Sequence, residues 1–158
     1  MKKKHITELL LFIVATELVG ALSALFVGKN FTFYKELAKP PFSPPGWIFP
    51  VMWAILYAVM AISVFLIFRS DAPQSKKRVA YWIYAIQLAV NFAWSIVFFR
   101  FRMLGLSVAV ILLLFIMILA MMAVFFRINR TAAYLNIPYL LWVLFASYLN
   151  IGVLLLSE

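Results

Sequence analysis

The chain has 158 residues, of which 67% are hydrophobic, 18% aromatic and 12% charged, and its mean hydropathy is +1.06. Soluble domains are about half apolar and about a quarter charged, so this composition excludes a globular cytosolic protein, a disordered chain and a disulfide scaffold. The net charge of +9 does not indicate nucleic-acid binding, because the basic residues fall in the gaps between apolar runs. We therefore expect an integral membrane protein with no nucleic-acid partner.

Five apolar runs are each longer than the roughly 20 residues that a helix needs to cross a bilayer. Lipid cannot satisfy backbone polar groups, so we predict an all-α integral membrane protein, a five-helix transmembrane bundle in a single domain over residues 1–158. The predicted spans are residues 6–27, 47–68, 79–99, 105–126 and 132–156. In the first of them, Glu17 and the apolar continuation to Val27 favour a retained span over a cleaved signal peptide.

Basic residues are divided unequally between the two ends of this bundle. Nine lie before the first span or in the second and fourth loops, namely Lys2, Lys3, Lys4, Arg69, Lys76, Lys77, Arg78, Arg127 and Arg130. Five lie in the first and third loops, namely Lys29, Lys35, Lys39, Arg100 and Arg102. Basic loops remain on the cytoplasmic side, so we expect a cytoplasmic N-terminus and an external C-terminus.

Few residues in the chain could support metal or acid–base chemistry. Cysteine is absent, and the only histidine, His5, stands among N-terminal lysines, where we expect it to be solvated. Glu17 is the only carboxylate in the middle of a span, so two-carboxylate hydrolysis has no pair of groups. We predict no metal site and no required cofactor. Glu17 is expected to be protonated or paired, either as a proton or ligand contact or as an inter-helix hydrogen bond.

The first loop, residues 28–46, reads GKNFTFYKELAKPPFSPPG and is the longest connection. Its four prolines between Pro40 and Pro45 favour an extended path, and residues 33–39 are expected to form one or two helical turns. Long loops in compact proteins are usually functional, so we predict a lid, with a simple tether as the alternative.

Two faces of the third span differ in character. Gln87, Asn91 and Ser95 recur every four residues and therefore share one face, which should point into the bundle or a cavity. Hydrogen bonding between helices, without a ligand, is the alternative. The opposite face carries Ala85, Ala89 and Ala93, small residues that suit a homodimer contact or internal packing.

Aromatic residues recur at helical spacing in the second and fifth spans. Trp53 and Tyr57 share a face of the second span, and Trp142 and Ala146 share a face of the fifth. Trp142 lies deep enough to need a partner for its indole N–H. Together with the polar face of the third span, these groups would wall an apolar cavity suited to a flat, hydrophobic, conjugated ligand.

Three segments carry a resemblance to a known family. They read KPPFSPPGWIFPVMWAILY from Lys39, QLAVNFAWSIVFF from Gln87 and PYLLWVLFASYLN from Pro138. The chain resembles the TspO/translocator protein family, also called tryptophan-rich sensory proteins or peripheral benzodiazepine receptors, over nearly its whole length. This resemblance implies a five-helix protein of a membrane, here expected to be a bacterial cell membrane, and a homodimer, here expected through Ala85, Ala89 and Ala93.

The resemblance also implies a ligand and a site. The ligand would be a tetrapyrrole such as protoporphyrin IX, or an isoquinoline or benzodiazepine-type drug, and the protein would be a receptor or sensor. The protein would promote the light-dependent oxidative degradation of this ligand, with Trp53 and Trp142 involved. The alternative function is a transporter that carries porphyrins or similar hydrophobic molecules across the membrane. The implied lining consists of Tyr34, Phe49, Trp53, Asn91, Ser95, Trp142, Ala146 and Leu149.

Three positions depart from the family pattern. Phe42 stands where many relatives have a lid tryptophan, and Val110 stands near a position that is commonly acidic. No basic residue follows Tyr148, so the aromatic–basic motif associated with cholesterol in animal members is incomplete.

Overall fold

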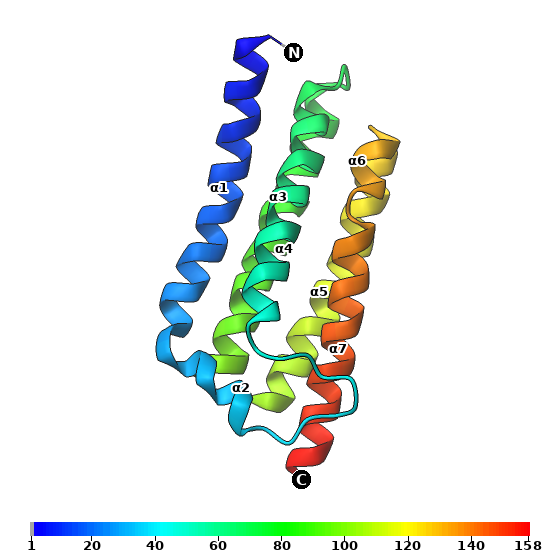
Figure 1. The fold of residues 1–158 in the computed structure, drawn as a ribbon. Helices are drawn as coiled ribbons and strands as arrows, with labels where there is room; N and C mark the ends of the chain where they lie inside the picture. The colour runs from blue at the N-terminus through cyan, green and yellow to red at the C-terminus, as the bar shows by residue number, and fades with distance from the viewer. Residues whose placement is uncertain (1) are drawn as a thin grey trace.

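The computed structural model describes residues 2–158, which form helices and no strand. Five helical segments are long and apolar enough to cross a membrane. The chain passes back and forth between two ends, and its termini lie at opposite ends of the bundle (Figure 1). The all-α, five-span fold predicted from the sequence is therefore confirmed.

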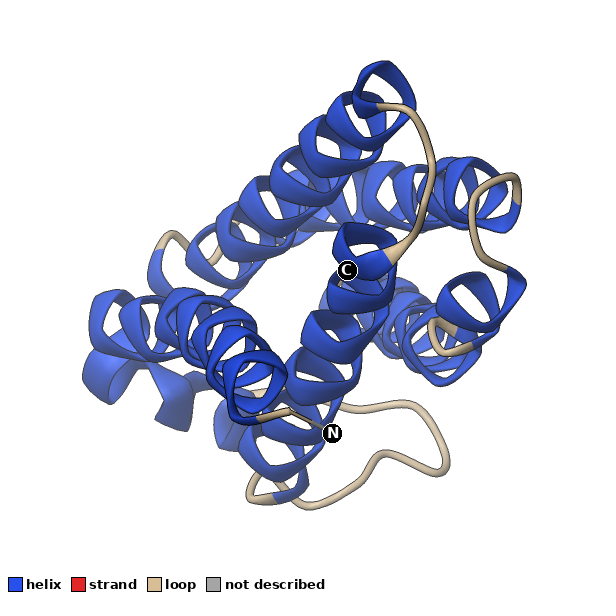
Figure 2. Cartoon of the chain, turned by 90° about the horizontal axis from the view of Figure 1, so that it is seen from above, coloured by secondary structure: helices blue, strands red, loops and turns tan. Residues whose placement is uncertain are grey.

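The helices have the following bounds: α1 Lys3–Val27, α3 Ile48–Arg69, α4 Gln74–Ser95, α5 Leu104–Phe126, α6 Arg130–Tyr134 and α7 Ile137–Ser157. α1 packs mainly against α3, and α5 packs against both α4 and α7 (Figure 1). Viewed from above, the connections are loops between helices, and no sheet is present in residues 2–158 (Figure 2).

Two of the predicted spans differ from the helices in the structure. The third begins at Gln74, and after Ser95 it continues as a π-helical segment, η2 Ile96–Arg100. The fifth is divided into α6 and α7, because Pro138 at the start of α7 has no N–H to bond the preceding turn. Asn129 caps α6 by accepting a hydrogen bond at Oδ1 from Ala132 N, 3.0 Å away.

The first loop begins with helical structure and ends in an extended segment. A 3₁₀ turn, η1 Gly28–Thr32, leads into α2 Phe33–Glu36, after which the proline segment crosses to α7 and returns to α3 (Figure 1). Two tyrosine hydroxyls hold this path: Tyr34 Oη donates to Pro44 O at 2.7 Å, and Tyr148 Oη donates to Pro41 O at 2.8 Å. The proline segment is thus held by α2 at one point and by α7 at another.

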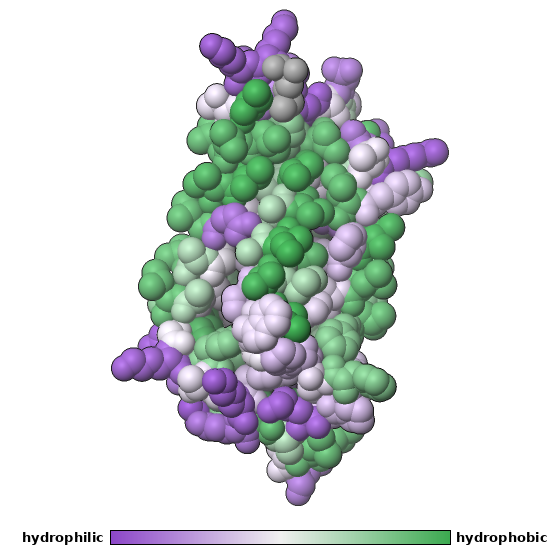
Figure 3. All heavy atoms as spheres, in the orientation of Figure 1, coloured by the Kyte–Doolittle hydropathy of each residue, from purple (hydrophilic) through white to green (hydrophobic). Residues whose placement is uncertain are grey.

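The surface of the bundle is that of a membrane protein. Most of the visible face is apolar, and hydrophilic residues gather mainly at its two ends (Figure 3). Large apolar side chains such as Leu25, Ile116 and Leu155 are exposed along the helices. A surface of this kind is stable only in hydrocarbon, so the protein is an integral membrane protein.

α1 and α3 approach each other closely at Gly20. A Cβ atom added to Gly20 would lie 2.5 Å from Cε2 of Tyr57, closer than any real carbon contact. Gly20 therefore allows α1 to rest directly on the Tyr57 ring.

We expect Gly20→Ala to destabilise the bundle by about 1 to 3 kcal/mol, the usual cost of overpacking a tight contact. The melting temperature of the detergent-solubilised protein, followed by circular dichroism, should fall. Gly105→Ala is the matched control, because a Cβ there would meet nothing within 4 Å and a helix favours alanine. Equal melting temperatures for the two variants would contradict this assignment.

Candidate functional site

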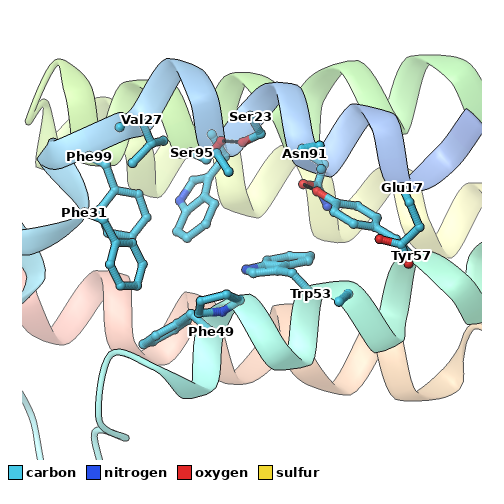
Figure 4. Close-up of a pocket in the computed structure, with 17 residues that line it drawn as sticks. Glu17, Ser23, Val27, Phe31, Phe49, Trp53, Tyr57, Asn91, Ser95 and Phe99 are labelled. Carbon is cyan, nitrogen blue, oxygen red and sulfur yellow. Dashed lines mark hydrogen bonds between the residues drawn. The ribbon is translucent and has the colours of Figure 1, made fainter. Parts of the chain in front are cut away.

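A cavity of about 500 Å³ lies between α1, α3 and α4 near the end of the bundle that carries the first loop (Figure 4). Its volume falls in the range of roughly 300 to 1,000 Å³ that is usual for small-molecule sites. The lining residues are Glu17, Gly20, Ala21, Ser23, Ala24, Val27, Gly28, Phe31, Phe49, Pro50, Trp53, Ala54, Tyr57, Asn91, Trp94, Ser95 and Phe99.

Aromatic rings make up much of the cavity wall. The Trp53 indole is stacked on Tyr57, with ring centroids 5.8 Å apart, and its centroid is 6.3 Å from that of Trp94. Phe31 from η1 packs against Phe99 from η2, 5.3 Å away, at the loop end of the cavity (Figure 4). Such flat apolar faces suit a planar conjugated ligand.

A chain of buried hydrogen bonds holds the inner end of the cavity. Tyr57 Oη donates to Asn91 Oδ1 at 2.7 Å, and Asn91 Nδ2 donates to Tyr139 Oη at 2.8 Å. Tyr139 Oη in turn donates to Gln87 Oε1 at 2.7 Å. The chain joins α3, α4 and α7, and it satisfies polar groups that hydrocarbon could not.

Two further sets of hydrogen bonds fix the walls. Ser23 on α1 and Ser95 on α4 are hydrogen-bonded through their hydroxyls at the cavity surface (Figure 4). Trp94 Nε1 donates to Asn150 Oδ1 at 2.7 Å, and Asn150 Nδ2 donates to Ser107 Oγ at 2.9 Å. The Trp94 ring is thereby held in position against α7 and α5.

Comparison with known proteins agrees with this architecture. The pattern of the TspO/MBR family matches residues 12–156. The chain belongs to the TspO/MBR family.

Curated relatives cover most of the chain. The chain is 36% identical over 142 residues to "Tryptophan-rich protein TspO" of Chlorobaculum tepidum, covering 86% of this chain and 90% of the relative. It is 36% identical over 141 residues to "Translocator protein" of Bos taurus, covering 88% and 83%. It is 34% identical over 118 residues to "Tryptophan-rich sensory protein" of Cereibacter sphaeroides, covering 75% and 72%. The resemblance inferred from the three sequence segments is thus confirmed.

The eight residues that the TspO resemblance assigned to the site do not line one cavity. Phe49, Trp53, Asn91 and Ser95 line the cavity between α1, α3 and α4. Tyr34, Ala146 and Leu149 instead line a much smaller space of about 20 Å³, and Phe49, Trp94 and Phe99 line both spaces.

Trp142 lines neither of these two spaces. Its ring centroid is 5.7 Å from that of Phe49 and 6.5 Å from that of Trp53, so it supports the cavity wall from behind. Its buried Nε1 has no hydrogen-bond partner within residues 2–158. The partner that the sequence led us to expect for this N–H is therefore not found there.

Both interpretations of the polar face of α4 apply, at different residues. Gln87 is completely buried in the inter-helix hydrogen bonds, as the ligand-free alternative required. Asn91 and Ser95 also form inter-helix bonds, yet they line the cavity. The stripe on the opposite face of α4, formed by Ala85, Ala89 and Ala93, is exposed.

Sequence reasoning missed several lining residues that TspO-type motifs did not single out. Ser23 and Trp94 were not predicted to line a site, although both lie on the cavity surface. The sequence did indicate which face of α1 turns inward, because the polar residues Thr16 and Ser23 are two turns apart and therefore share a face. That face meets α4, where Thr16 Oγ1 and Tyr84 Oη are hydrogen-bonded at 2.6 Å.

Two of the departures from the family pattern lie away from the cavity. Phe42 is 90% exposed at the turn of the proline segment and has a left-handed backbone, with φ of 67°. Val110 packs against the apolar core on α5. Neither residue lines either of the two spaces described above.

The indole N–H of Trp94 has a hydrogen-bond partner and that of Trp142 has none in the described part of the chain, and this difference can be tested. Trp94→Phe removes the donor to Asn150 and leaves a buried carbonyl unpaired, so it should destabilise the protein by about 1 to 2 kcal/mol. Trp142→Phe removes an N–H that has no partner, so it should cost less at nearly the same change in volume. Thermal unfolding in detergent measures both, and a larger loss for Trp142→Phe would contradict the hydrogen-bond assignment.

Proposed function

We propose that the protein is a membrane sensor that binds tetrapyrroles such as protoporphyrin IX in the cavity between α1, α3 and α4, and promotes their light-dependent oxidation. The observation that carries this proposal is the aromatic-walled cavity of about 500 Å³ with the Trp53 indole on its surface. A flat conjugated macrocycle matches such walls, and the same walls would accept isoquinoline or benzodiazepine-type drugs. The names of two relatives, which describe tryptophan-rich and sensory proteins, agree with this role.

Charge near the loop end of the cavity supports an acidic ligand. Arg100 Nη1 donates to Phe26 O at 3.2 Å, which places this guanidinium against α1 one residue before Val27 of the lining. Arg100 is exposed, so it is free to receive a carboxylate as well. The propionates of a porphyrin would therefore lie at this end, with the macrocycle between the aromatic walls.

The chemistry of degradation would come from the ligand, light and oxygen. A metal-free porphyrin is itself a photosensitiser, and dioxygen is the oxidant. The protein would hold the ligand beside oxidisable indoles, Trp53 at the cavity surface and Trp142 directly behind it.

Binding is tested by fluorescence. Protoporphyrin IX should quench the tryptophan emission of the detergent-solubilised protein with saturation. Trp53→Ala should weaken binding by about two- to tenfold, because a ring contact contributes about 0.5 to 1.5 kcal/mol. Trp82→Ala is the control, since Trp82 is 65% exposed and outside the cavity. Equal affinities for the two variants would place the site elsewhere.

Photochemistry separates a catalyst from a receptor or a transporter. We expect degradation of bound protoporphyrin IX to require light and oxygen, to survive chelators, and to slow in Trp53→Phe and Trp142→Phe while binding persists. Absorbance at the main porphyrin band follows the reaction. Turnover in the dark, or full activity in the double variant, would contradict the mechanism and favour a porphyrin receptor or transporter.

We further propose a homodimer formed through the exposed stripe Ala85, Ala89 and Ala93 on α4. Small side chains let two helices approach closely. Ala89→Leu should shift the protein toward monomer, as measured by light scattering in detergent. Ala109→Leu makes the same change at an exposed position on α5 and should leave the mass unchanged. An unaltered dimer in Ala89→Leu would reassign the stripe to lipid contact.

The proposed orientation in a bacterial cell membrane places the N-terminus in the cytoplasm and the first loop and C-terminus outside. The chain has no cysteine, so a single introduced cysteine is the only thiol of the protein that a thiol reagent can label. In intact cells an impermeant thiol reagent should label Ser157→Cys and not Ser75→Cys. The reverse pattern would invert the topology.

A further inference from the structure

Glu17 is a functional group that the proposed tetrapyrrole site does not use. It is the only acidic side chain in the cavity lining, and no lysine, arginine or histidine of residues 2–158 lines the cavity with it. Figure 4 shows Glu17 beside Tyr57 at the inner end, far from Phe31 and Phe99 at the loop end. Arg100, which bonds Phe26 O next to Val27 of the lining, lies near the loop end, so Glu17 and Arg100 are at opposite ends of the cavity.

The protein provides no partner for this carboxylate. Within residues 2–158, Glu17 forms no hydrogen bond and no ion pair, whereas Glu8 pairs with Arg69 at 3.7 Å and Glu36 pairs with Arg102 at 3.9 Å. The hydroxyl groups nearby bond other residues, and none of them is hydrogen-bonded to Glu17. Tyr57 donates to Asn91, and the hydroxyls of Thr16 and Tyr84 bond each other.

A carboxylate at this depth is costly unless something compensates its charge. No described residue around the cavity does so, which leaves two ways to remove the cost: protonation of the empty site, or a cationic group on a molecule bound in the cavity. A protonated amine is the natural complement, because it forms a charge-assisted hydrogen bond to a carboxylate. The aromatic ring of Tyr57, which lies beside Glu17 (Figure 4), adds attraction for a cation.

We propose that Glu17 makes the inner end of this cavity a binding site for a cationic nitrogen, so that the protein also binds planar aromatic amines. The amine would lie at Glu17, the aromatic body along the Trp53 ring, and any carboxylate of the ligand at the Arg100 end. This inference rests on the proposed function only in taking the cavity as the ligand site. It assigns that site a ligand charge preference and an orientation.

The test compares three ligands that share one ring system and differ in charge: naphthylmethylamine, methylnaphthalene and naphthoic acid. Isothermal titration calorimetry measures their affinities for the detergent-solubilised wild type, for Glu17→Gln and for Glu36→Gln. Glu17→Gln preserves size and removes a charge from the hydrocarbon, so folding is retained. Glu36→Gln is the matched control, because Glu36 is an exposed carboxylate in α2 outside the cavity.

We expect Glu17→Gln to weaken binding of the amine by about tenfold or more, to leave methylnaphthalene unchanged, and to strengthen binding of naphthoic acid. Glu36→Gln should match the wild type with all three ligands. Equal affinity of wild type and Glu17→Gln for the amine would overturn the inference, because a protonated Glu17 is mimicked by glutamine. Failure of the amine to bind the wild type would overturn it as well.

The outcome is independent of the porphyrin experiment. Saturable quenching by protoporphyrin IX without a Glu17-dependent amine affinity would remove this inference and leave the proposed function intact. A Glu17-dependent amine affinity without porphyrin binding would support the inference and remove tetrapyrroles as the ligand.

Discussion

The requirement that every polar group inside the bilayer find a partner within the protein determines how this bundle is assembled. Tyr57, Asn91, Tyr139 and Gln87 meet it with a continuous chain of hydrogen bonds that joins α3, α4 and α7. Displacement of any one of these helices would leave at least two buried groups unpaired. The arrangement of three helices therefore follows from a few amides and hydroxyls, because apolar contact between helices gives little preference over contact with lipid.

The cavity depends on the same bonds. The Tyr57 hydroxyl and the Asn91 amide oxygen are hydrogen-bonded to each other. These two side chains therefore line the inner end of the cavity with that donor and that acceptor already paired. Trp94 is fixed in a similar way by Asn150. A wall whose aromatic rings are held by buried hydrogen bonds is organised before a ligand arrives, which lowers the entropy lost on binding.

The number and approximate bounds of the spans could be predicted because hydrophobic length alone decides them. The inward direction of Gln87, Asn91 and Ser95 was also predictable, since their four-residue spacing fixes a face. Their partners were not, because spacing on one helix says nothing about which neighbouring helix faces it. The separation of Tyr34, Ala146 and Leu149 from the main cavity depends on the aromatic rings that line both spaces, those of Phe49, Trp94 and Phe99, and the periodicity of a sequence does not specify side-chain rotamers. The π-helical end of α4 likewise had no signature in the apolar pattern.

α1 differs from the other long helices in how little of it is buried. Only Thr16, Ser23 and Val27 are buried along its 25 residues, although the helix forms one whole wall of the cavity. Elements with few buried contacts yield first when a structure is distorted. A ligand larger than the empty space would displace α1 by breaking its two side-chain hydrogen bonds to α4, that of Thr16 with Tyr84 and that of Ser23 with Ser95, while the bonds that join α3, α4 and α7 stay intact. Such a compliant wall would let one rigid frame accommodate ligands of very different bulk.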